Sequence, residues 1–92
     1  MHHSIIGLAA ILAAFPLSAV ADEAAVQACT KALSPAARMI YDASAASLPP
    51  DSALRDVIAA QTRKLVMTGR IERAVARPAA EEAGTCLKMA QQ

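Results

Sequence analysis

An apolar run near the N-terminus limits how much of this chain is left to fold. Ile5–Phe15 holds eleven residues without a charge, Pro16 follows it, and Ala19–Ala21 fits an A-x-A cleavage pattern. The run has the length of a secretory h-region, about 7–15 residues, and is shorter than the about 20 that span a bilayer. We therefore expect residues 1–21 to be a cleaved signal peptide and residues 22–92 to form a single small helical domain.

This signal is of a bacterial type, so we expect a periplasmic protein, with secretion as the alternative. Its n-region departs from the usual pattern, since it contains His2 and His3 but no Lys or Arg. An uncleaved N-terminal anchor is therefore a second interpretation. Cleavage after Ala21 would leave 71 of the 92 residues, with no transmembrane span.

Two cysteines, Cys29 and Cys86, lie near the two ends of the expected mature chain. A domain of this size has a marginal core and commonly needs a covalent or metal staple. In an oxidising compartment, one such pair predicts a disulfide. It would close a loop of about 58 residues and contribute roughly 4 kcal/mol in the chain-entropy model. A redox-active pair is expected instead as C-x-x-C.

The composition predicts an all-α fold. Alanine is abundant, and only Gly69 and Gly84 remain after residue 21, which favours helix. We predict a small four-helix bundle clipped by the disulfide, or three helices plus a short segment. The expected helices span about 22–33, 35–47, 52–68 and 77–90, with a turn and a short helical piece at 70–76.

Capping residues set these bounds. Ser34 and Pro35 suit the N-cap and first position of the second helix. Asp51 or Ser52 would cap the third, and Gly69 would end it in a left-handed conformation. For the last helix, Pro78 is expected in the first turn.

Helical spacing also predicts the buried faces. In the last helix, Gly84 is expected to allow close approach opposite Cys29. The residues expected to face inward are Val26, Cys29, Leu33, Ala36, Met39, Ile40, Ala43, Leu54, Val57, Ile58, Gln61, Leu65, Ala79, Ala83, Cys86, Leu87 and Ala90.

Enzymatic activity is not expected from the residues available. After residue 21 there is no His, so the usual general base and the Ser-His and Cys-His nucleophile arrangements cannot be built. The carboxylates Asp51 and Asp56, or Glu81 and Glu82, are poorly spaced to act as a pair. We predict no catalytic residue, no cofactor and no metal site.

The segment Thr62–Arg77 carries a local net charge of +4. Arginine forks suit carboxylates and phosphates, so we take this segment as a face for an anionic partner. The alternative is a solvated surface near two helix C-termini, where cations are favoured anyway. The candidate residues are Arg63, Lys64, Arg70, Arg73 and Arg77.

A second candidate surface holds Tyr41 with Met39, Met67 and Met89, because exposed methionines make adaptable contacts. At helical spacing beside Ile40, Met39 is more simply explained as part of the core.

In size, compartment and cysteine count, the chain resembles the HdeA-type periplasmic acid-stress chaperones. That resemblance implies unfolding and client protection in acid, as one alternative function. The function we expect first is non-catalytic binding of an envelope partner. Binding to anionic lipid or lipopolysaccharide through the arginines is a further alternative. The near-neutral net charge of +1 argues against nucleic acid.

Overall fold

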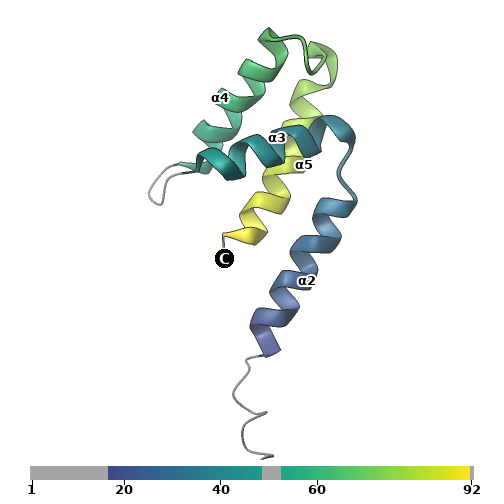
Figure 1. Ribbon diagram of the computed structural model, residues 1–92, viewed down its shortest axis with the longest axis vertical. Coiled ribbons are helices and arrows are strands. Elements are labelled where there is room, and N and C mark those ends of the chain that lie inside the picture. Colours follow the sequence, from purple (N-terminus) through teal and green to yellow (C-terminus); the bar gives the residue numbers. More distant parts are fainter. Residues whose placement is uncertain (1–16, 49–52, 92) are drawn as a thin grey trace, which may run out of the picture.

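The chain folds into a small all-α bundle, seen in a computed structural model that describes residues 17–48 and 53–91. Within these ranges there are four helices and no strand: α2 (Leu17–Lys31), α3 (Pro35–Ser47), α4 (Leu54–Met67) and α5 (Arg73–Ala90). The last helix is central, since α2, α3 and α4 all pack against it (Figure 1). The predicted four-helix bundle is therefore confirmed. None of the described helices is long and apolar enough to cross a membrane.

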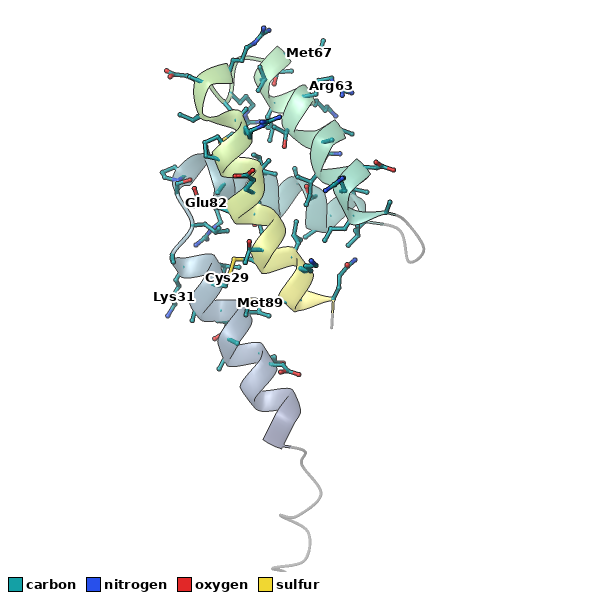
Figure 2. All side chains as sticks on the ribbon, turned by 180° about the vertical axis from the view of Figure 1, so that it is seen from behind. Cys29, Lys31, Arg63, Met67, Glu82 and Met89 are labelled. Atoms are coloured by element: carbon teal, nitrogen blue, oxygen red, sulfur yellow. A yellow bond between two sulfur atoms is a disulfide. The ribbon has the colours of Figure 1, made fainter. Side chains whose placement is uncertain are left out.

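A disulfide between Cys29 and Cys86 joins α2 to α5 (Figure 2), as predicted. The two Cα atoms lie 5.6 Å apart, within the usual range for a bridged pair. Cys86 is fully buried, whereas Cys29 is half-buried. The N-terminal part of α2 extends past the C-terminal end of α5 (Figure 1), so the bridge fixes only the C-terminal part of α2 to the bundle.

The turn between α2 and α3 is fixed by side chains from both sides. Ser34 Oγ accepts a hydrogen bond from the Ala37 amide at 3.2 Å, so the predicted N-cap is confirmed. The Glu82 carboxylate of α5 accepts from the Ser34 amide at 3.2 Å and from Ser34 Oγ at 3.3 Å. On the other side of the turn, Arg38 donates to the Thr30 carbonyl at 2.8 Å. A carboxylate thus lies at a helix N-terminus and a cation at a helix C-terminus, each where the helix dipole favours it.

The end of α4 is a Schellman motif. The Gly69 amide donates to the Val66 carbonyl at 3.0 Å, and the Arg70 amide donates to the Leu65 carbonyl at 2.9 Å. Gly69 has a φ of 77°, which confirms the predicted left-handed end. This tight turn reverses the chain, and buried Ile71 anchors it before α5 begins.

The core is thin and is built mostly from alanine, isoleucine and leucine. In α5, the predicted inward face is confirmed except for Ala90, which is exposed. In α3, Ile40 is buried as predicted, but its fully buried partners are Ala37 and Ser44, whereas the predicted Ala36, Met39 and Ala43 are half-buried. Alanine and serine carry little hydropathy signal, so the pattern could not show which of them faces inward. The buried apolar cluster is Ala37, Ile40, Ile58, Ile71, Ala79, Ala83 and Leu87.

The bounds of α2, α4 and α5 differ from the predicted ones. The first helix begins at Leu17, five residues earlier than expected, and ends at Lys31. The N-cap of α4 is Ala53, which makes no side-chain capping hydrogen bond. The expected caps, Asp51 and Ser52, lie outside the residues that the structure describes. The apolar run Ile5–Phe15 also lies outside them.

The largest difference concerns Pro78, which lies inside α5 and not in its first turn. The helix begins at Arg73, so the predicted separate piece at 70–76 is largely the first turn of α5. A proline at this depth removes one helical hydrogen bond, the one to the Ala74 carbonyl. Because Ala74 is exposed, water can satisfy that carbonyl, and the helix continues through the proline.

Candidate functional site

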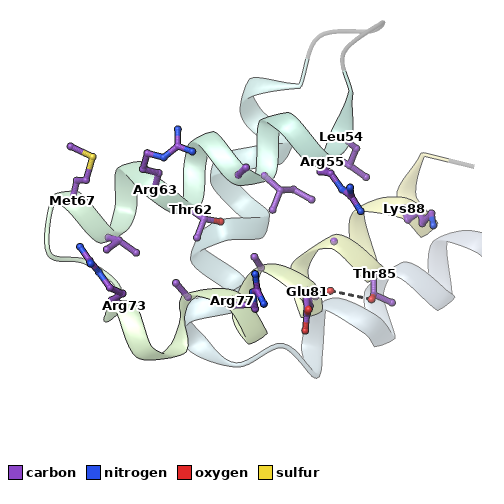
Figure 3. A pocket seen from close by; sticks show the side chains of 16 residues that line it. Leu54, Arg55, Thr62, Arg63, Met67, Arg73, Arg77, Glu81, Thr85 and Lys88 are labelled. Carbon is purple, nitrogen blue, oxygen red and sulfur yellow. Dashed lines mark hydrogen bonds between the residues drawn. The ribbon is translucent and has the colours of Figure 1, made fainter.

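An open groove of about 930 Å³ runs between α4 and α5 (Figure 3). The two helices form a hairpin joined by the turn at 68–72, so the groove is lined by antiparallel neighbours. We call it the α4–α5 groove. It is lined by Leu54, Arg55, Ile58, Ala59, Thr62, Arg63, Val66, Met67, Arg73, Ala76, Arg77, Ala80, Glu81, Gly84, Thr85 and Lys88.

The floor of the groove is apolar, and its α5 side is made of small residues. Ala76, Ala80 and Gly84 line the α5 side, and Ile58 and Val66 line the α4 side. A Cβ built on Gly84 would meet Ile58 Cδ1 at 3.4 Å. Gly84 therefore faces α4, and our expectation that it lies opposite Cys29 is wrong. The small side chains leave room above the floor for apolar atoms of a ligand.

Cations line both edges of the groove, and Figure 3 shows them coming from both helices. Among the residues that the structure describes, five Lys and Arg and one carboxylate, Glu81, line it. The groove thus has a net charge of +4. The other residues that the structure describes hold four cations and six carboxylates, a net charge of −2. A chain that is almost neutral as a whole is therefore strongly polarised. The cations are Arg55, Arg63, Arg73, Arg77 and Lys88.

The side chains lining the groove make few polar contacts with one another. Among them, the structure shows one hydrogen bond, from Thr85 Oγ1 to the Glu81 carbonyl at 3.1 Å (Figure 3). Arg63, Arg73, Arg77 and Lys88 are all exposed. Their charged ends are therefore free to turn toward a ligand above the floor.

Two of these cations lie where the helix dipole disfavours them. Arg73 is the first residue of α5, directly after the N-cap Glu72, and Arg55 is the second residue of α4, next to Asp56 in the same first turn. Cations near a helix N-terminus are destabilising by about the amount that anions there stabilise, 0.3–1 kcal/mol. Helix stability therefore does not explain these two arginines, whereas Lys88, in the last turn of α5, is favourably placed.

The structure brings together only part of the predicted anionic-partner face. Arg63, Arg73 and Arg77 line the groove, whereas Lys64 and Arg70 are exposed but do not line it. Arg70 precedes α5, so it does not share a helical face with Arg73 and Arg77.

Sequence reasoning missed Arg55 and Lys88. The spacing between Arg55 and Arg63 could have indicated that they belong together. Eight residues are about two helical turns, so both lie toward one side of the same helix. Lys88 becomes a neighbour of Arg55 only because α4 and α5 are antiparallel.

Two further side chains that line the groove are Met67 and Thr62. Met67, at the end near the turn, is 78% exposed and is the most exposed large apolar side chain of the described residues. Thr62 Oγ1 is buried within the groove wall and has no hydrogen-bond partner.

Tyr41 and Met39 pack against the core, so the predicted tyrosine–methionine surface is reduced to Met67 and the half-buried Met89.

The residues that line the groove suit a ligand that is both anionic and apolar. The cations of the groove suit carboxylates or phosphates, and its floor suits apolar groups. No cluster of three or more His, Cys, Asp or Glu able to hold a metal occurs in the described part of the chain. Comparison with protein-family models, with curated proteins and with solved structures finds no match, so the groove is interpreted from its own residues.

Proposed function

We propose that this chain is a small exported protein that binds an anionic partner in the bacterial envelope through the α4–α5 groove. The observation that carries the proposal is the charge of +4 gathered around an apolar floor in a chain with a net charge of +1. Charge complementarity of this kind selects partners and speeds their encounter.

Export is supported by two features of the chain. The disulfide between Cys29 and Cys86 is typical of oxidising compartments such as the periplasm. The apolar run Ile5–Phe15 and the small residues before Asp22 match a signal peptide. We place the protein in the periplasm, with secretion as the alternative, and we assign it no catalytic activity, because residues 22–92 contain no histidine.

Site-specific photo-crosslinking in cells tests this proposal. A photoreactive residue at Ala59, which lines the groove and is exposed, should cross-link to a discrete envelope partner. The matched control is the same residue at Ala45, which is exposed on α3 and does not line the groove. The double reversal Arg73→Glu with Arg77→Glu should abolish the Ala59 cross-link.

Equal cross-linking from both positions, or an unchanged product after charge reversal, would contradict groove binding. The intact mass of the envelope protein, measured with thiol labelling, tests export. A chain that begins at Asp22 and has no free thiol supports it, whereas a full-length chain with two free thiols refutes it.

A second candidate function is acid-activated client protection. Glu82 supports it, because this single carboxylate makes two hydrogen bonds that tie α5 to the start of α3. Lowering the pH to about 2–3 protonates carboxylates. The expected result is a loosened bundle that suppresses aggregation of a client protein. A native far-UV and near-UV circular dichroism spectrum at that pH, with no client protection, would remove this candidate.

A further inference from the structure

We infer that the ligand of the α4–α5 groove is an acidic amphipathic helix of about three turns, contributed by a partner protein. This inference rests on the proposed function and adds the chemistry and shape of the partner. It follows from three properties of the groove: its length, the small residues of its floor, and the spread of its cations.

The groove is long enough to hold a helix. Along α4, the residues from Arg55 to Met67 rise by about 18 Å at about 1.5 Å per residue, which matches about three helical turns. Packed helices approach to about 8–10 Å when the contact residues are small. Ala76, Ala80 and Gly84 provide such a contact along α5. A third helix can therefore lie over α4 and α5, as amphipathic helices do in recognition grooves.

The cations are spread along the whole groove. Arg55 and Lys88 lie toward one end and Arg73 toward the other, near Met67, with Arg77 one helical turn along α5 from Arg73 (Figure 3). Between Arg77 and Lys88, α5 rises by about 16 Å. A helix with carboxylates on several turns can pair with cations at both ends. A phospholipid with one phosphate carries its charge at one end of its acyl chains, so it would leave the cations of the other end without a partner.

A second copy of the same groove does not fit. Two such surfaces facing each other across a two-fold axis would place a charge of +4 against a charge of +4. Like charges facing each other across an interface disfavour association. The occupant must instead carry the opposite charge together with an apolar stripe.

The test is a binding measurement on the purified protein with its disulfide intact. The probe is a fluorescent helical peptide of about 12 residues, with leucine along one face and glutamate on both flanks of that face. A twin peptide carries lysine in place of every glutamate. Vesicles of phosphatidylglycerol with phosphatidylcholine provide the lipid arm, and fluorescence anisotropy and vesicle co-sedimentation provide the readouts.

Two charge-reversed variants make the comparison specific. Arg73→Glu with Arg77→Glu reverses two groove cations, and Lys64→Glu with Arg70→Glu reverses two exposed cations outside the groove. Both variants change the net charge equally. We expect the glutamate peptide to bind, the lysine peptide not to bind, and the groove variant to lose about tenfold or more in affinity. The control variant should stay within about twofold, because exposed charges away from the contact are screened.

Equal losses in both variants, or no binding of the glutamate peptide, would overturn the inference. So would groove-dependent binding of the vesicles in place of the peptide, which would make the ligand a lipid. Failure of the inference is separate from failure of the proposed function. If the peptide does not bind but the Ala59 cross-link in cells still depends on Arg73 and Arg77, the groove binds an anionic partner of another shape. If that cross-link is independent of both arginines, the proposed function itself fails.

Discussion

Reducing the disulfide between Cys29 and Cys86 should remove most of the stability of this bundle. The bridge joins residues 57 apart in sequence. Closing a loop of that length lowers the entropy of the unfolded chain by an amount worth roughly 4 kcal/mol at 25 °C. Small domains have a total free energy of unfolding of about 5–15 kcal/mol. With a core of this size, we place the oxidised protein at the low end of that range, and the reduced protein within about 1–2 kcal/mol of unfolding.

Urea unfolding followed by far-UV circular dichroism measures this difference. With an m-value of about 1 kcal/mol/M, the unfolding midpoint should fall by about 4 M on reduction. The variant Cys29→Ala with Cys86→Ala is the control: it should unfold near the reduced wild type and should not respond to the reductant. It is expected to be slightly less stable than the reduced protein, because Cys86 is 0% exposed and alanine leaves a small cavity there.

A reduced protein that loses less than about 1 kcal/mol would refute the reasoning. It would mean that the unfolded chain is already compact enough for the bridge to restrict it little. The m-value distinguishes this outcome from experimental error, since a compact unfolded state lowers m in the reduced protein.

Three further substitutions probe the packing and the caps. Gly84→Ala should stabilise α5 by up to about 1 kcal/mol in thermal unfolding, because alanine has the higher helix propensity. The added methyl group fits, since a Cβ at this position lies 3.4 Å from Ile58 Cδ1, an ordinary contact distance. Destabilisation would show that the methyl group clashes with α4. Ser44→Ala should raise stability by about 1 kcal/mol, because Ser44 is 0% exposed and its hydroxyl has no hydrogen-bond partner; a loss of stability would reveal a partner such as a bound water. Ser34→Ala should cost about 1 kcal/mol, since Ser34 Oγ caps α3 and also contacts Glu82, and hydrogen exchange should rise first in the first turn of α3; uniform exchange across all helices would contradict a local capping role.

The fold was predictable from the sequence where single residues determine local structure. Ser34 and Pro35 fix the start of α3, and Gly69 fixes the end of α4, because each has a stereochemical role that few residues fill. Pro78 misled the prediction, because it was expected in the first turn, the position where a proline costs a helix least, and it lies inside α5.

The candidate site was predictable only in part. The cluster of Arg63, Arg73 and Arg77 is visible in the sequence because the turn between α4 and α5 is short. The other groove cations, Arg55 and Lys88, are distant in sequence and meet only through the antiparallel pairing of the two helices. Alanine forms both the core and the floor of the groove, so hydropathy could not separate a buried face from an open one.

The stability that the disulfide contributes can offset what the open groove costs the fold. The apolar floor of the groove exposes surface that a tighter bundle would bury. Burying such surface stabilises a fold by about 25 cal/mol for each Å². The arginines in the first turns of α4 and α5 add a further cost through the helix dipoles. A bridge worth roughly 4 kcal/mol can offset both. Reversing Arg73 to Glu should therefore stabilise the protein slightly while weakening partner binding. Because only a residue selected for binding is expected to show opposite effects on stability and affinity, measuring both on this variant separates a functional arginine from a merely solvated one.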